Sequence, residues 1–186
     1  MPNSLCKRWF VFFLHCFFVQ GIAVPSKATA VNPLDGCGEA FNKEGGAMPF
    51  VGIGTSNKKM DAYIKELKDQ SVLVVVDVRA RPQSQWFPHF NRQRLQASLA
   101  ENGITYLWLG DKLGNPKDES GKRTLEGFKK IMETDAYKEG METLMELARK
   151  QKGKIALTCS EGKESECHRK LILEDLQRRL CPSKAK

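Results

Sequence analysis

Short apolar runs alternate with amphipathic segments from residue 48 onward. Residues 72–78, VLVVVDV, form a continuous β-branched run, which is typical of a strand covered on both faces. Residues 49–57, 104–110 and 154–160 carry similar apolar runs that end at glycine or polar residues. Strands are therefore predicted at all four places.

The segments between these runs favour helices and loops. Apolar residues recur at helical spacing in residues 58–70, 91–103, 128–132, 135–151 and 165–180. We expect Ser56 or Asn57 to cap the first of these helices. Residues 80–90 and 110–123 are rich in Pro, Gly or Lys, and we expect loops there.

The order of the predicted elements defines a fold class. Strands alternate with helices along the chain, and this alternation is typical of βαβ units. The prediction is a three-layer αβα domain of the α/β class. Its sheet is mostly parallel, has about four to five strands and carries helices on both faces.

The N-terminal part predicts a targeting segment. Lys7 and Arg8 precede a short apolar run, and Ala28 and Ala30 follow it with the spacing of a cleavage site. Residues 1–30 are interpreted as a signal peptide or an organelle-targeting leader, so the chain would be secreted or organellar. An uncleaved anchor, or an upstream start codon in a cytoplasmic protein, is the alternative. Residues 31–47 would be a linker or extension, and residues 48–182 a single domain.

Charge and cysteine content set weak limits on function. Removal of the leader, with its three basic residues and no acidic ones, would lower the net charge from +8 to +5. This permits an anionic small molecule or nucleotide as a partner. Nucleic acid is possible, although no dense basic stripe is present. Cys37, Cys159, Cys167 and Cys181 would remain, and their pairing stays open.

Polar residues end the predicted strands and indicate a shared site. The carboxyl ends of parallel strands meet at one edge of a sheet, where ligands bind in open α/β folds. Ser56 and Asn57 follow the first strand, and Asp77 and Arg79 follow the second. We expect these four residues to bind a substrate. Asp77 could instead pair with Arg79 in a purely structural role.

Cys159 is the candidate reactive group at the end of the fourth strand. A following helix and basic neighbours would lower the pKa of its thiol. Glu161 or His168 would transfer protons, and Arg169 would hold an anion. An unreactive buried cysteine is the alternative. A Cys-x5-Arg phosphatase is excluded because the sixth residue after Cys159 is serine.

Cys159, Cys167 and His168 also raise two structural alternatives. They would supply three metal ligands, but their spacing matches no common zinc pattern. Neighbours on a helix point about 100° apart, so Cys167 and His168 should not both face the site. We therefore expect no metal and no cofactor. A disulfide between Cys159 and Cys167 is the remaining alternative, with uncertain geometry.

Five segments together resemble the DUF488 family of uncharacterised proteins. They are VGIGTSN, VVVDVRARPQS, LAENGITYLWLGDKLG, GFKKIMETDAYKEGMETLMELA and IALTCSEGKESECHRKLI. The resemblance implies a small α/β protein without an agreed activity. It also implies a cytosolic location, and the predicted leader of residues 1–30 does not fit that location. The VVVDVR strand end and the Cys159 loop are also similar, over a short stretch, to rhodanese domains.

Two functions follow from these patterns. The first is an enzyme acting on a phosphate-bearing or nucleotide-like substrate, with Cys159 as nucleophile or redox thiol. The second is a non-catalytic module that binds a nucleotide or nucleic acid through Arg79, Arg169 and the lysines of residues 110–123.

Overall fold

Residues 48–163 and 167–180 are described in a computed structural model of the chain. Four parallel strands form one sheet in the order β1-β4-β2-β3. The strands are β1 (Phe50–Gly54), β2 (Val72–Asp77), β3 (Thr105–Trp108) and β4 (Lys154–Cys159). This sheet confirms the predicted α/β fold. The predictions for residues 1–47, including Cys37, and for Cys181 lie outside the described residues.

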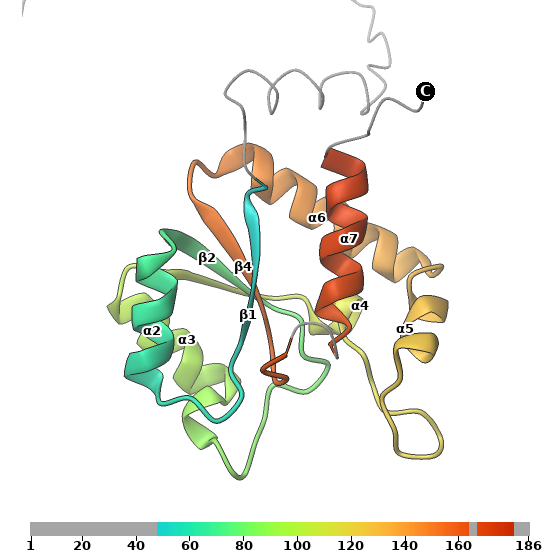
Figure 1. The fold of residues 1–186 in the computed structure, drawn as a ribbon, viewed down its shortest axis with the longest axis horizontal. Coiled ribbons are helices and arrows are strands. Elements are labelled where there is room, and N and C mark those ends of the chain that lie inside the picture. Colours follow the sequence, from blue (N-terminus) through green and yellow to red (C-terminus); the bar gives the residue numbers. More distant parts are fainter. Residues whose placement is uncertain (1–47, 164–166, 181–186) are drawn as a thin grey trace, which may run out of the picture. The chain divides into compact units, whose positions relative to one another are not determined.

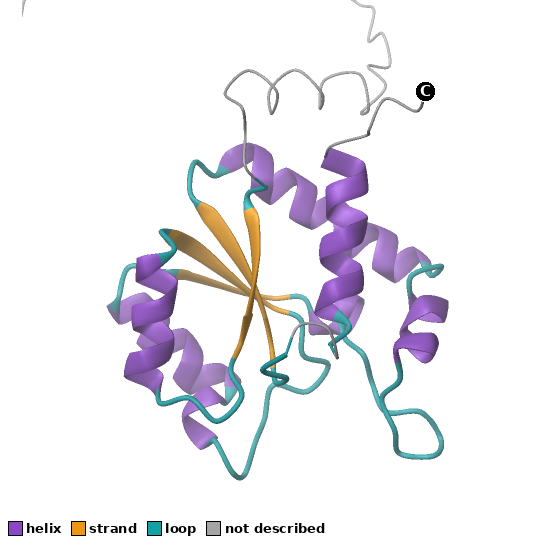
Figure 2. Cartoon of the chain, viewed as in Figure 1, coloured by secondary structure: helices purple, strands orange, loops and turns teal. Residues whose placement is uncertain are grey.

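Helices cover both faces of the sheet (Figures 1 and 2). The helical elements are α2 (Met60–Asp69), η1 (Pro88–Phe90), α3 (Arg92–Glu101), α4 (Gly110–Leu113), α5 (Leu125–Ile131), α6 (Asp135–Lys150) and α7 (Arg169–Leu180). Helices α2 and α3 lie on one side, and α4 to α7 lie on the other (Figure 1). The sheet is thus the middle of three layers.

Alternation along β2 divides the apolar core between the two faces. Val75 packs with the buried side chains of α2 and α3, such as Leu67 and Leu95. Val74 and Val76 pack with the opposite cluster, which includes the buried face of α6. Apart from Leu73, which is 47 % exposed, the side chains on both faces of β2 are buried, and this explains why the sequence of the strand is apolar almost without interruption.

Local structure differs from the sequence prediction in three places. Helix α2 begins at Met60, and its N-cap is Lys59 without a side-chain hydrogen bond, so Ser56 and Asn57 do not cap it. Residues 110–113 form α4 rather than a loop, because Leu113 is fully buried in the core. Helix α7 begins at Arg169, so Cys167 and His168 precede the helix instead of lying within it.

The strand order leaves a crevice at the carboxyl edge of the sheet. The chain leaves β1 and β2 toward α2 and α3, but it leaves β4 toward α7 on the opposite side (Figure 1). Strand β4 lies between β1 and β2. Connections that part to opposite faces leave a crevice between neighbouring strand ends, and ligands of open α/β sheets bind there.

Among the described residues, no helix meets the length and hydropathy needed to cross a bilayer.

Candidate functional site

The carboxyl ends of β1, β2 and β4 meet in register. Gly54 is aligned with Cys159, and Asp77 is aligned with Thr158. Backbone hydrogen bonds continue past the strand ends, from Thr55 N to Cys159 O (2.9 Å) and from Val78 N to Thr158 O (3.1 Å). A Cβ on Gly54 would collide with the carbonyl oxygen of Glu161, so only glycine lets the loop after β4 pack on β1.

A polar pocket opens at this edge beside the loop after β2. Its volume is about 410 Å³, within the range of small-ligand sites. It is lined by Thr55, Ser56, Asn57, Arg79, Gln83, Ser84, Phe87, Phe90 and Ser160. Ser56 adopts a positive φ of 40°, a strained conformation for a residue with a side chain. The pocket therefore combines hydroxyl and amide groups with an aromatic wall.

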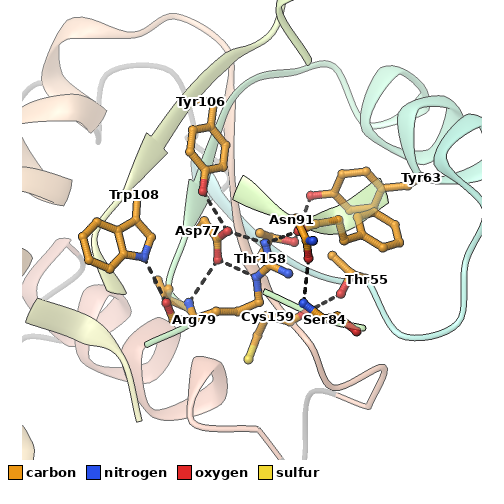
Figure 3. Close-up of polar contacts among 12 residues, drawn as sticks. Thr55, Tyr63, Asp77, Arg79, Ser84, Asn91, Tyr106, Trp108, Thr158 and Cys159 are labelled. Carbon is orange, nitrogen blue, oxygen red and sulfur yellow. Dashed lines mark hydrogen bonds and ion pairs between the residues drawn. The ribbon is translucent and has the colours of Figure 1, made fainter. Parts of the chain in front are cut away.

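Asp77 and Arg79 form a buried ion pair above β2 (Figure 3). Arg79 Nε donates to Asp77 Oδ1 (2.8 Å), and Arg79 Nη2 donates to Asp77 Oδ2 (2.5 Å). Tyr106 Oη also donates to Asp77 Oδ2 (2.9 Å), and Arg79 Nη2 donates to the carbonyl oxygen of Phe90 (2.9 Å). Asp77 is fully buried and does not line the pocket. Its contacts are those of a structural partner of Arg79.

This ion pair offsets the positive charge of Arg79. Burial by itself would lower the pKa of the guanidinium, but the hydrogen bonds and the charge of Asp77 outweigh burial and raise it. Arg79 therefore stays charged, and the carboxylate of Asp77 compensates its charge. It reaches the pocket as a hydrogen-bonding group rather than as a free cation.

Four potential ligand or proton-transfer groups converge beside the end of β4. They are Cys159, Glu161, Cys167 and His168, and one donor atom from each lies within 4.8 Å of all the others. Cys159 Sγ is 2.6 Å from Glu161 Oε2, and Cys167 Sγ is 3.4 Å from the same oxygen. His168 Nδ1 lies 3.8 Å from Cys159 Sγ and 3.7 Å from Cys167 Sγ. We call these four residues the thiol cluster.

The contacts of His168 fix its tautomer. Nε2 lies 3.1 Å from the carbonyl oxygen of Val78, which can only accept a hydrogen bond, so Nε2 carries a proton. In the neutral ring, the lone pair of Nδ1 then points at the two sulfur atoms. The expectation that Cys167 and His168 cannot both face the site was wrong, because a turn before α7 presents both side chains to it.

The surroundings of Cys159 keep its thiol protonated. The hydrogen bond with Cys167 and burial raise the pKa of Cys159, and together they outweigh the opposite effect of His168. Burial would raise the pKa of Glu161, but the hydrogen bond from Cys159 and further donors lower it overall. The lowered thiol pKa expected from the sequence is therefore not found. An ionised carboxylate accepts hydrogen bonds from two thiols, and both cysteines are free.

Arg169 follows the thiol cluster directly and is almost completely buried. Its side chain is 1 % exposed. Nη2 lies 3.5 Å from the carbonyl oxygen of Glu161, whereas Nε and Nη1 have no hydrogen-bond partner within the described part of the chain. A buried cation without an anionic partner is costly. Among the described residues, the guanidinium has no anionic partner.

The structure divides the residues predicted from sequence between two neighbouring places. Ser56, Asn57 and Arg79 line the pocket. Cys159, Glu161 and His168 form the thiol cluster, with Cys167 as a fourth member, and none of these four residues lines the pocket. Cys167 and Tyr106 were not predicted from the sequence as site residues. Tyr106 lies 29 residues along the chain from its partner Asp77. The adjacent Cys and His in the sequence were the only signal for Cys167.

Comparison with known proteins adds a family and no activity. A family model described as "Domain of unknown function DUF488" matches residues 59–176. No curated protein and no solved structure matches the chain. The matched segment runs from the start of α2 into α7 and includes every member of the thiol cluster.

Proposed function

We propose that this chain, which belongs to the DUF488 family, a domain of unknown function, is an enzyme for a small phosphate-bearing or nucleotide-like substrate. The substrate would bind at the carboxyl edge of the sheet. The thiol cluster would supply the reactive groups, with Cys159, Glu161 and His168 as catalytic residues.

The pocket supports a substrate of modest size. Its volume of about 410 Å³ suits a mononucleotide better than a macromolecule. Phe87 and Phe90 offer an apolar wall for a ring, and Ser56, Asn57 and Ser160 offer hydrogen-bonding groups. Arg79 would orient the substrate, because Asp77 already compensates its charge.

Arg169 is the observation that carries the anionic part of the proposal. The side chain is buried, positively charged and lacks partners for Nε and Nη1 among the described residues. Phosphate oxygens accept paired hydrogen bonds from a guanidinium with good geometry. Arg169 does not line the pocket, so the loop after β4 would have to shift for a phosphate to reach the guanidinium. Pairing with the phosphate would then remove the cost of this unpaired buried cation.

The thiol cluster supports a chemical step rather than binding alone. Glu161 Oε2 lies 2.6 Å from Cys159 Sγ, within reach of a direct proton transfer that would leave a thiolate and a protonated carboxyl group. In the free protein the proton stays on sulfur, since the pKa of Cys159 is raised and that of Glu161 is lowered. A thiolate would form only when a bound group stabilises the negative charge.

Calorimetric titration with AMP and with adenosine tests the substrate class. We expect AMP to bind and adenosine to bind at least about tenfold more weakly, because one charged hydrogen bond contributes about 1.5–3 kcal/mol. Arg169→Gln should weaken AMP binding by a similar factor, and Arg169→Lys should restore part of the loss. Equal affinity for AMP and adenosine would contradict an anion site.

Arg178→Gln is the matched control for this titration. Arg178 lies on the same helix as Arg169 but is 72 % exposed and pairs with Asp175. The control variant should bind AMP as the unmodified chain does. Far-UV circular dichroism of the Arg169 variants separates loss of the site from loss of the fold.

The second candidate is a binding module without catalysis. Its support is the protonated, buried state of Cys159. Cys159→Ala decides between the two. If the protein is an enzyme, this variant should bind the ligand with unchanged affinity but no longer convert it, which phosphorus NMR would show. Absence of conversion in the unmodified chain would favour the module. Its nucleic-acid form has less support, because Lys112 pairs with Glu139.

A further inference from the structure

The thiol cluster has the composition and geometry of a metal site. We propose that Cys159, Glu161, Cys167 and His168 bind one zinc ion in a tetrahedral arrangement. The inference goes beyond the proposed function and does not depend on its substrate. A bound zinc ion would occupy Cys159, Glu161 and His168, so in the zinc-loaded chain these residues would be ligands rather than a free nucleophile and free proton-transfer groups. It replaces the expectation from sequence that the chain holds no metal.

The donor set favours zinc over hard cations. Magnesium and calcium prefer oxygen ligands, whereas thiolate and imidazole together favour zinc and related transition metals. Two sulfur atoms, one ring nitrogen and one carboxylate oxygen complete four positions. Zinc uses these donor types in four-coordinate sites.

The distances between donors approach those of a tetrahedron. With Zn–S near 2.3 Å and Zn–N near 2.0 Å, sulfur and nitrogen in a tetrahedral site are about 3.5 Å apart. His168 Nδ1 lies 3.8 and 3.7 Å from the two sulfur atoms, and Cys167 Sγ lies 3.4 Å from Glu161 Oε2. Of these four donor–donor distances, only the 2.6 Å hydrogen bond from Cys159 to Glu161 is too short for a tetrahedral site. Replacing its proton by the ion requires a shift on the order of 1 Å to reach the Zn–S and Zn–O geometry.

His168 is held as a metal ligand would be. Metal-binding histidines donate their second ring nitrogen to a carbonyl or carboxylate, which orients the ring and fixes its tautomer. His168 Nε2 has this partner in the carbonyl oxygen of Val78, at 3.1 Å. The ring also packs against Phe128, with centroids 4.9 Å apart. The lone pair of Nδ1 is therefore directed at the cluster before any ion is bound.

The charge of the site is compatible with a buried divalent ion. Replacing two thiol protons by Zn²⁺ leaves the net charge of the cluster unchanged, because the two thiolates balance the double positive charge of the ion. Glu161 is half-buried while the other three members are buried, so the ion can enter on the side of the carboxylate.

Cobalt substitution of the full chain tests the coordination. The reduced, chelator-treated protein is titrated with Co²⁺ and then with Zn²⁺. We expect one equivalent of Co²⁺ to give the strong visible bands of a tetrahedral ion, together with thiolate charge-transfer absorption. One equivalent of Zn²⁺ should remove both. Weak octahedral bands without thiolate absorption would overturn the proposal.

Matched variants identify the ligands. We expect each of four variants to weaken zinc binding at least about 100-fold, measured in competition with a chromophoric chelator: Cys159→Ser, Cys167→Ser, Glu161→Gln and His168→Asn. This loss exceeds the effect of removing a residue that only hydrogen-bonds to a metal ligand. The controls are His89→Asn and Glu126→Gln, at a histidine and an exposed acid outside the cluster. Unchanged affinity in both cysteine variants would refute the site and assign the ion to other groups.

A second measurement covers variants that fail to fold. Zinc should raise the Tm of the unmodified chain, and it should protect Cys159 and Cys167 from alkylation. Recovery of both cysteines as a disulfide in the zinc-treated protein would overturn the inference. Zinc binding without AMP binding would refute the proposed substrate alone, and AMP binding without zinc would refute the metal site alone.

Discussion

Removing Arg79 tests whether this residue is a structural partner of Asp77. In Arg79→Ala, Asp77 stays fully buried and loses the donors Nε and Nη2. It keeps Tyr106 Oη and the backbone nitrogen of residue 79, which donates to Oδ1 at 3.0 Å. Breaking a buried ion pair by removing one partner costs about 3–5 kcal/mol. We expect a loss near the lower end, because two neutral donors remain.

Urea unfolding followed by circular dichroism measures this loss directly. A decrease of about 3 kcal/mol in the free energy of unfolding should appear as a lower midpoint with an unchanged slope. For a domain of this size the Tm should fall by roughly 10–15 °C. Arg178→Ala is the control, since the partly exposed pair with Asp175 contributes about 1 kcal/mol or less.

A double-mutant cycle separates the ion pair from the packing of the arginine side chain. Asp77→Asn combined with Arg79→Ala should cost less than the sum of the single changes, by about 1–3 kcal/mol. Additive effects, or a loss below about 1 kcal/mol in Arg79→Ala, would refute the structural role. Arg79 would then be available as an anion anchor.

Four further predictions follow from the same contacts. Thr134→Ala removes the hydroxyl that accepts from Tyr137 N at the start of α6, and the free energy of unfolding should fall by about 1 kcal/mol; Thr143→Ala, whose hydroxyl bonds within the helix, is the comparison. Gly54→Ala should displace the loop that carries Glu161 and abolish zinc binding. Gly103→Ala should lower the stability of the fold, because residue 103 has a positive φ of 71°, but it should leave zinc binding unchanged because no atom lies near a Cβ there. In chelator-treated protein at neutral pH, Cys159 should react with iodoacetamide more slowly than a free cysteine peptide, because its raised pKa keeps the thiol protonated; faster labelling would contradict that protonation state. Tyr63→Phe removes the hydrogen bond to Thr158 Oγ1 (2.8 Å) and should cost about 1 kcal/mol by urea unfolding, and no loss would show that the hydroxyl is not needed.

The patterns along the chain were enough to predict the layers and the edge of the molecule where polar groups gather. β-Branched runs such as residues 72–78 have little freedom except as buried strands, and the face of α6 was predicted from its 3.6-residue period. Because parallel strands all end at one edge, the residues after β1, β2 and β4 had to lie near one another. This proximity follows from the direction of the strands alone.

Which of these polar groups interact depends on the folded arrangement. Strand order β1-β4-β2-β3 is not encoded in any local pattern, and the pocket and the thiol cluster share no residue. The turn before α7 brings Cys167 and His168 to the same side, which the helical period had excluded. The tautomer of His168 likewise depends on a partner distant in the chain, the carbonyl oxygen of Val78, and burial contributes to the raised pKa of Cys159. Periodicity describes one element at a time, whereas a site depends on distances between elements.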